Sequence, residues 1–185
     1  LRKDRTQFEE AAALFRDALA IRQKLLGDEH VDVAATVYDL AETLQSAGHL
    51  AECEPLHRQA LALFRKLRGE EHPDVARCLT GLGLLMTNRE DYGAAEPYFR
   101  AALAMNRRLL GDTHPDVATS AINLAKLLHV TGDYAAADPL FREGIATYRK
   151  RLLPSYDVFD EGRYFEPGDR PLVLRVRGRR VAVTI

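Results

Sequence analysis

Histidines, cysteines and a close pair of glycines are the residues of this chain whose types could carry metal, thiol or phosphate chemistry. His30, His72 and His114 recur 42 residues apart. A zinc site would need their side chains to converge at bonds of about 2 Å, whereas equivalent positions on packed helices lie about 10 Å apart. We therefore expect these histidines to serve the starts of helices, and we expect no metal or other cofactor.

The two cysteines, Cys53 and Cys78, also indicate packing and not catalysis. They form no Cys-x-x-Cys motif, so the sequence offers neither a disulfide framework nor a zinc knuckle. A thiol without an activating partner usually packs as a small apolar residue. Gly81-Leu-Gly83 lies inside an expected helix, which argues against a phosphate-binding loop. The repeating part of the chain is therefore predicted to be non-enzymatic.

Length and charge narrow the classes of partner. The chain has 185 residues, a formal charge of −1 and 46% hydrophobic residues, which is enough to bury a core. The near-zero charge removes the general attraction to nucleic acid or anionic lipid. No run approaches about 18 apolar residues, and the first residues lack the layout of a secretory signal. We predict a cytoplasmic protein without nucleic-acid or membrane partners.

An internal repeat positions these residues. The pattern Gly-(Asp/Glu)-x-His begins at Gly27, Gly69 and Gly111, which are 42 residues apart. Self-similarity at a fixed period indicates stacked structural units. The chain is expected to begin inside a repeat and to be cut at both ends. The predicted units are a partial repeat and three full repeats, with the ranges 1–26, 27–68, 69–110 and 111–152.

Each full repeat is predicted to form two helices. Pro73 and Pro115 suit the first position of a helix, because proline fixes φ there and lacks only an N–H that would be unpaired. Gly48 and Gly132 suit the tight turn before the second helix. Glu90 takes this place in the second repeat, which predicts a different turn there. Since a helix pair cannot bury its apolar stripe alone, the pairs are expected to stack.

These repeats resemble the tetratricopeptide repeat family, in the long variant found in kinesin light chains. The resemblance covers residues 1–152 and implies an all-α fold, a right-handed solenoid of antiparallel helix pairs with 42-residue repeats. His57 stands where the other repeats have phenylalanine, so this slot is expected to pack less tightly. The resemblance rests on the Gly-Asp-x-His-Pro-Asp-Val-Ala linker and on small and large apolar residues of the third repeat: Leu124-Ala125-x-x-Leu128, Gly132-Asp-Tyr134 and Ala137-x-x-x-Phe141.

By the same resemblance, the first helices of the repeats line a concave groove. The chain would then be a non-enzymatic scaffold that binds a peptide segment of another protein there. Affinity is expected from apolar contacts such as Tyr38, Leu84 and Ile122. Many relatives carry paired asparagines in this groove, of which only Asn123 is present here. The groove positions implied are Ala35, Tyr38, Asp39, Glu42, Gln45, Arg77, Thr80, Gly81, Leu84, Thr87, Thr119, Ile122, Asn123, Lys126 and His129.

Residues 153–185, here called the tail, break the period, because no fourth Gly-Asp-x-His follows residue 152. The last part alternates β-branched and arginine residues on both sides of Gly178, which predicts a short extended segment or β-hairpin. A lone hairpin is marginally stable in water. Its open edges are therefore expected to pair with another sheet edge.

The segment from Tyr148 to Ile185 resembles part of the nitrilase-type glutaminase domain of glutamine-dependent NAD synthetases. The string Tyr148-Arg-Lys-Arg-Leu-Leu-Pro-Ser-Tyr-Asp-Val-Phe-Asp-Glu161 carries this resemblance. In that family the lysine at Lys150 belongs to a Glu-Lys-Cys set. The carboxylate takes the thiol proton, the cation stabilises negative charge, and the thiolate attacks an amide. The cysteine would follow Ile185 and the glutamate has no counterpart, so Lys150 is expected to be non-functional.

Two interpretations of the whole chain stay open. In the first, it is an interaction scaffold with a glutaminase-like fragment at 153–185. In the alternative, it is a truncated or misjoined fragment of a glutamine-dependent NAD synthetase, inactive as it stands. The string Tyr148-Arg-Lys-Arg-Leu152 fits both families, so a composite sequence joined at this string is one hypothesis.

Overall fold

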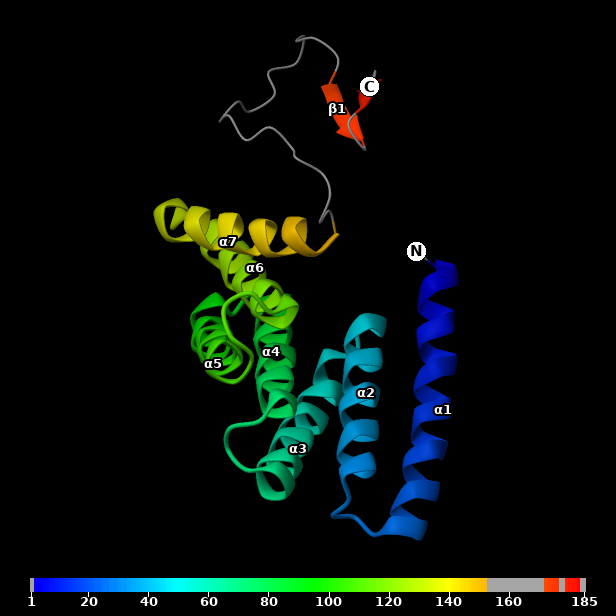
Figure 1. The fold of residues 1–185 in the computed structure, drawn as a ribbon. Helices are drawn as coiled ribbons and strands as arrows, with labels where there is room; N and C mark the ends of the chain where they lie inside the picture. Colours follow the sequence, from blue (N-terminus) through cyan, green and yellow to red (C-terminus); the bar gives the residue numbers. More distant parts are fainter. Residues whose placement is uncertain (1, 153–171, 177–178, 184–185) are drawn as a thin grey trace.

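Seven α-helices occupy residues 2–152 of the computed structural model (Figure 1). The structure describes residues 2–152, 172–176 and 179–183, and the side chains of residues 6–149. The all-α fold expected for the repeats is confirmed for this part of the chain. The helices are α1 (Arg2–Leu26), α2 (Val31–Ala47), α3 (Leu50–Arg68), α4 (Pro73–Asn88), α5 (Tyr92–Leu110), α6 (Pro115–Val130) and α7 (Tyr134–Leu152).

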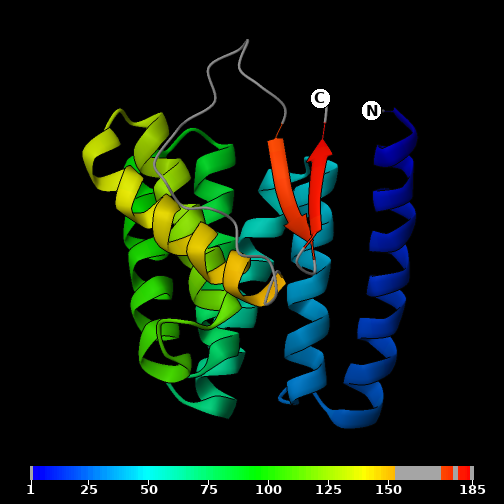
Figure 2. The same cartoon turned by 45° about the horizontal axis from the view of Figure 1, so that its top comes forward.

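The helices stack in chain order as pairs. α2 packs on α3, α4 on α5, and α6 on α7, and each pair contacts the next through α3–α4 and α5–α6. α1 packs on α2 in the place of a preceding second helix. The first helices α2, α4 and α6 begin 42 residues apart. Figures 1 and 2 both show α7 running obliquely to α1, so the stack twists along its length, as a solenoid does.

Each first helix begins at a histidine. The Nδ1 atoms of His30, His72 and His114 accept hydrogen bonds from the backbone N–H groups two residues ahead, at 3.2, 3.1 and 3.2 Å. Each histidine therefore fills the N-cap position and satisfies a donor that has no partner within the helix. Because Nδ1 is the acceptor, the ring proton lies on Nε2. The expected role of these histidines at the helix starts is confirmed.

The turn inside each repeat has the same geometry in all three. Gly48, Glu90 and Gly132 follow the first helices with φ values of 86°, 62° and 90°. In each turn the next residue donates its N–H at 2.9 Å to the carbonyl five residues back, as Asp91 does to Met86. The expectation of a different turn at Glu90 is therefore wrong. Helix packing on both sides holds a non-glycine residue in a left-handed conformation that costs it about 1–2 kcal/mol.

Large side chains of the second helices fill the core between layers. His57, in the slot expected to pack loosely, is fully buried, as are Phe64 and Phe99. A Cβ on Gly81 would lie 2.7 Å from His57 Cε1, so the imidazole occupies the space that this glycine leaves. The ring also meets Tyr38 edge-on, with 5.6 Å between centroids. The expectation of looser packing is wrong, because the glycine opposite makes room for the ring.

Two short strands follow the helical part. β1 (Leu172–Val176) pairs antiparallel with β2 (Arg179–Val183), and Leu172 faces Val183 in their register. Residues 153–171, 177–178 and 184–185 lie outside the described residues, and so does the side chain of Lys150. The glutaminase-like assignment of the tail and the role of Lys150 therefore stay predictions.

Replacing His72 with alanine should lower the free energy of unfolding by about 1 kcal/mol, because it removes the N-cap acceptor of α4. His72→Asn is the matched control, since asparagine is a preferred N-cap residue and should keep most of the stability. Urea unfolding followed by circular dichroism at neutral pH compares the variants. Equal losses in both would show that the histidine contributes through packing and not through the cap.

Candidate functional site

Two adjoining hollows lie on the face formed by the first helices. The first hollow, of about 410 Å³, is bounded by α1, α2 and α4. The second hollow, of about 450 Å³, is bounded by α2, α4, α5 and α6. Glu42 and Leu84 line both hollows, so the two meet at these residues. We call the two hollows together the groove.

Many of the groove positions implied by the sequence line these hollows. They are Tyr38, Glu42, Gln45, Arg77, Thr80, Gly81, Leu84, Thr119 and Asn123. The remaining positions are absent from the lining of both hollows. They are Ala35, Asp39, Thr87, Ile122, Lys126 and His129.

Ile122 and His129 face the second helix of their own repeat. A Cβ on Gly144 would lie 2.5 Å from Ile122 Cγ1, so Ile122 packs where α7 has no side chain. The His129 ring meets the Tyr134 ring edge-on, with 5.0 Å between centroids. Both residues therefore stabilise the α6–α7 pair and do not line the groove.

Glu42, at the junction of the two hollows, is held by Tyr38. The Tyr38 hydroxyl donates to Glu42 Oε1 at 2.7 Å. Burial, with the Glu42 charge as the next cause, raises the pKa of Tyr38 far above its ordinary value, so the hydroxyl stays a donor. The Arg77 guanidinium lies 4.5 Å from the Tyr38 ring centre. Through its hydrogen bond, Tyr38 orients the Glu42 carboxylate. Because Tyr38 is only 2% exposed, it offers little surface of its own to a ligand.

Gln45 is tied to the core beneath the first hollow. Its Oε1 can only accept, so His57 donates from Nε2 across 2.9 Å. Burial lowers the pKa of His57 to about 4, which leaves the ring neutral at neutral pH. His57 Nδ1 then has no hydrogen-bond partner among the described residues. Gln45 therefore has its oxygen engaged by α3, and its amide nitrogen can donate to a ligand.

Sequence reasoning missed much of the lining, above all Asn106. This residue lies on α5, a second helix, yet it lines the second hollow and is only 6% exposed. The sequence does contain one sign that Asn106 is unusual. The 42-residue period aligns it with Phe64, so an amide stands at a position that holds an aromatic ring in the preceding repeat. The other lining residues that were missed are Phe8, Thr43, Ser46, Pro73, Asp74, Asn88, Asp116 and Ser120.

The described residues support neither thiol nor metal chemistry. Burial raises the pKa of Cys78 to about 12 and also raises that of Cys53, so both remain thiols. Within the part of the chain that the structure describes, no cluster of three or more His, Cys, Asp or Glu side chains could hold a metal ion. In the same part, no helix combines the length and apolar character needed to cross a bilayer.

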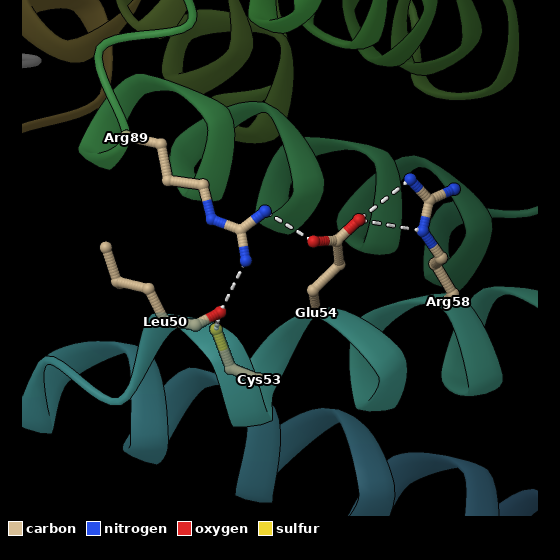
Figure 3. Close-up of polar contacts among 5 residues, drawn as sticks. All are labelled: Leu50, Cys53, Glu54, Arg58 and Arg89. Carbon is tan, nitrogen blue, oxygen red and sulfur yellow. Dashed lines mark hydrogen bonds and ion pairs between the residues drawn. The ribbon is translucent and has the colours of Figure 1, made fainter.

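A charged contact joins α3 to the end of α4 (Figure 3). Glu54 Oε1 accepts from Arg58 on the next turn at 2.9 Å, and Glu54 Oε2 pairs with Arg89. Arg89 also donates to the Leu50 carbonyl at 2.8 Å. The hydrogen bonds from Arg89 and Arg58 hold the pKa of Glu54 below its ordinary value. These contacts fix consecutive repeats against each other and so help to set the spacing of α2 and α4.

Comparison with known sequences identifies the family. The profile of the tetratricopeptide repeat matches residues 2–52, 32–108 and 85–150, which together span nearly all of the helical part. The chain belongs to the tetratricopeptide repeat family. Arrays of these repeats are protein–protein interaction scaffolds, and the stacked helix pairs described above form such an array.

Solved structures show the same fold. BtubC (BKLC) from P. vanneervenii superposes with a TM-score of 0.71 at 23% identity, over 89% of this chain and 65% of that protein. The nearly identical TPR-like repeats of a Podosopora anserina protein described as a putative kinesin light chain give a TM-score of 0.62 at 25% identity, over 79% of this chain and 69% of that one. A point variant of the same protein gives 0.65 at 24% identity, over 81% and 70%. The tetratricopeptide array is thus kinesin-light-chain-like in fold.

Curated relatives match only a short part of the chain. The glutamine-dependent NAD(+) synthetase of Aquifex aeolicus is 50% identical over 38 residues, and that of Thermotoga maritima is 55% identical over 38 residues. These matches cover 20% of this chain and 7% of each synthetase. They agree in family with the resemblance of the tail. The chain therefore spans a small fraction of those enzymes.

Replacing Glu54 with glutamine should lower the free energy of unfolding by about 0.5–1 kcal/mol at neutral pH, because it breaks a partly shielded ion pair between repeats. Since the pKa of Glu54 is lowered from 4.5 by folding, its contribution is present above that pH. It is lost as the pH falls through the folded-state pKa. Chemical unfolding of both proteins at neutral and at acidic pH should show the two stabilities converging in acid.

Glu96→Gln is the matched control for this prediction. Glu96 occupies the equivalent position in the next repeat and, among the residues whose side chains are described, pairs at 2.7 Å with Arg100 of its own helix alone. A pair within one exposed helix is worth about 0.3–0.5 kcal/mol. If the control loses as much stability as Glu54→Gln, the contact between repeats adds nothing.

Proposed function

We propose that the groove binds a peptide segment of a partner protein, in an extended or helical form. The observation that supports this is the continuity of the two hollows along α2, α4 and α6, through Glu42 and Leu84. Leu84 is 37% exposed and supplies apolar surface where the hollows meet. Thr80, Thr119 and Asn123 add hydroxyl and amide groups that suit a peptide backbone.

The charge of the lining favours a protein partner over a polyanion. Glu42, Asp74 and Asp116 line the second hollow together with a single cation, Arg77. Nucleic acid and anionic lipid are repelled by such a surface, whereas a peptide can match it. The proposal therefore leaves out nucleic acid and membrane as partners of the groove. A cytoplasmic, non-enzymatic scaffold without a cofactor stays a prediction from the sequence.

Leu84→Asn should weaken the binding of peptides selected from a random library against the wild-type chain by about tenfold, because it removes the apolar contact shared by both hollows. Leu109→Asn is the matched control. Leu109 is also 37% exposed, but it lies on α5 outside both hollows. Fluorescence titration of each selected peptide compares the variants. A library that yields no binder, or binders that ignore Leu84→Asn, would contradict the groove as the binding site.

The second candidate, a truncated or misjoined fragment of a glutamine-dependent NAD synthetase that is inactive as it stands, rests on the short matches to those enzymes. We infer that the array ends near residue 152 and that residues 153–185 are a glutaminase-like fragment of foreign origin. The 42-residue period aligns Lys150 with Lys66 and Arg108, basic residues in the last turns of α3 and α5. Lys150 therefore has a place within the repeat pattern that requires no catalysis.

Incubation of the chain with glutamine should release no measurable ammonia, because the fragment lacks both a nucleophilic cysteine and a general-base glutamate. A coupled ammonia assay makes the test, with Lys150→Ala beside the wild type. Ammonia release that disappears in Lys150→Ala would overturn the non-enzymatic assignment and favour the enzyme fragment.

A further inference from the structure

The junctions between consecutive repeats share the same order of helices but differ in several of the side chains that fill them, including the one at a particular slot. The second helix of each repeat presents this slot to the next first helix, and the 42-residue period assigns it to Arg22, Phe64 and Asn106. The facing residues are Thr36, Cys78 and Ser120. The three junctions therefore allow a comparison of how one space is filled.

The first junction holds a guanidinium that the chain itself supplies. Arg22 donates from one nitrogen to Thr36 Oγ1 at 2.5 Å and to the Asp32 carbonyl at 3.2 Å. Thr36 is buried, and its hydroxyl in turn donates to the same Asp32 carbonyl at 2.6 Å. A guanidinium is thus accommodated beside the first turn of α2, against a hydroxyl and a backbone carbonyl.

The second junction is closed by apolar groups. Phe64 is 1% exposed and Cys78 is fully buried, and both belong to one core cluster. The Phe64 side chain carries no polar group, and the nearby Arg77 guanidinium lies 5.9 Å from the centre of its ring. A polar side chain at this position is therefore found in the first and third junctions and is not common to all repeats.

The third junction has polar walls but a short side chain in the slot. Ser120 donates its only hydroxyl proton to the Asp116 carbonyl at 2.8 Å. The bond of 2.9 Å between Ser120 and Asn106 must then be donated by Asn106 Nδ2. This fixes the amide, so Asn106 Oδ1 points away from Ser120 and receives no hydrogen bond from any residue that the structure describes. An acceptor on a side chain that is only 6% exposed thus lines the second hollow.

The rest of the second hollow is rich in acceptors and in negative charge. Asp74, Asp116 and Glu42 line it, and Asn123 adds an amide. Its single cation, Arg77, is already engaged by Asp74 at 3.3 Å and by the Tyr38 ring. The hollow therefore favours a ligand group that carries several donors and positive charge.

We propose that the second hollow, beside the third junction, seats an arginine side chain of the bound partner, as the first junction accommodates the guanidinium of Arg22 from within the chain. This inference deepens the proposed function and rests on the groove being the peptide site. Arginine is favoured over lysine because its planar fork carries five donors, which suits acceptors on several sides. Asn106 Oδ1 and the carboxylate of Asp116 are the groups assigned to receive it.

Titration of the ¹⁵N-labelled chain with N-acetyl-arginine amide tests this seat. Saturable chemical-shift changes are expected at the Asn106 side-chain amide and at the Ser120 backbone amide. The matched neutral probe is N-acetyl-citrulline amide, which keeps the shape and loses the charge. It should bind at least about tenfold more weakly. N-acetyl-lysine amide should also bind more weakly, and equal binding of either probe would overturn the arginine assignment.

Asn106→Arg should abolish the response, because it supplies a guanidinium to the hollow as Arg22 does at the first junction. Asn88→Arg is the matched control, since it adds the same charge to the first hollow only and should keep the response. If Asn106→Arg does not fold, Asp116→Asn takes its place and should weaken arginine binding severalfold, with the exposed Asp17→Asn unchanged. An unaltered response in a folded Asn106→Arg protein would overturn the proposal.

This experiment separates the seat from the proposed function. Selected peptides that depend on Leu84 while arginine amide gives no response would leave the groove as the peptide site and refute the arginine seat. A response to arginine amide without any Leu84-dependent peptide would support the seat and refute the peptide groove.

Discussion

Each helix pair of this chain depends on its neighbours to cover its apolar stripe. Val33, Val75 and Val117 stand at equivalent positions of the three first helices, and all are fully buried. Apolar burial is the dominant favourable term in folding, and it needs close packing. The spacing of α2, α4 and α6 is therefore set by what fits between layers. The groove lies on the outer surface of these packed layers, so the spacing of the helices determines its shape.

Side chains at the junctions adapt this common frame in different ways. One junction holds the guanidinium of the exposed Arg22, one is filled by an aromatic ring, and one keeps polar walls around a hollow. The backbone turns are the same throughout, even where Glu90 replaces glycine with a φ of 62°. Repeat proteins of this kind can therefore vary their ligand surface while their helices stay in place, because the layers and not the lining residues carry the fold.

The local elements of the fold were predictable from sequence. Proline after histidine and a fixed period place α4 and α6 correctly, since capping and helical spacing act within a few residues. The errors concern contacts between distant residues. His57 looked like a packing defect because the compensating Gly81 lies in the next repeat. Ile122 looked like a groove residue because nothing in its own helix reveals that Gly144 leaves it space on α7.

The candidate site was predictable to the extent that it lies on the first helices. Glu42, Leu84 and Asn123 were identified through the resemblance to tetratricopeptide repeats, which implies that the first helices line the groove. Asn106 was not, because it lies on a second helix and its part in the lining depends on its contact with Ser120 in the next repeat. That geometry follows from the packing of whole layers, and no pattern within one helix encodes it.

The pairing of His57 with Gly81 fixes the order of the repeats. In the third repeat the position equivalent to Gly81 is Asn123. Removal of residues 69–110 as one block would keep the period but would bring the imidazole against an asparagine side chain. Although their backbones are alike, the units are therefore not interchangeable. Loss of that unit would therefore require a compensating substitution at the new boundary, because the imidazole now lies against a glycine.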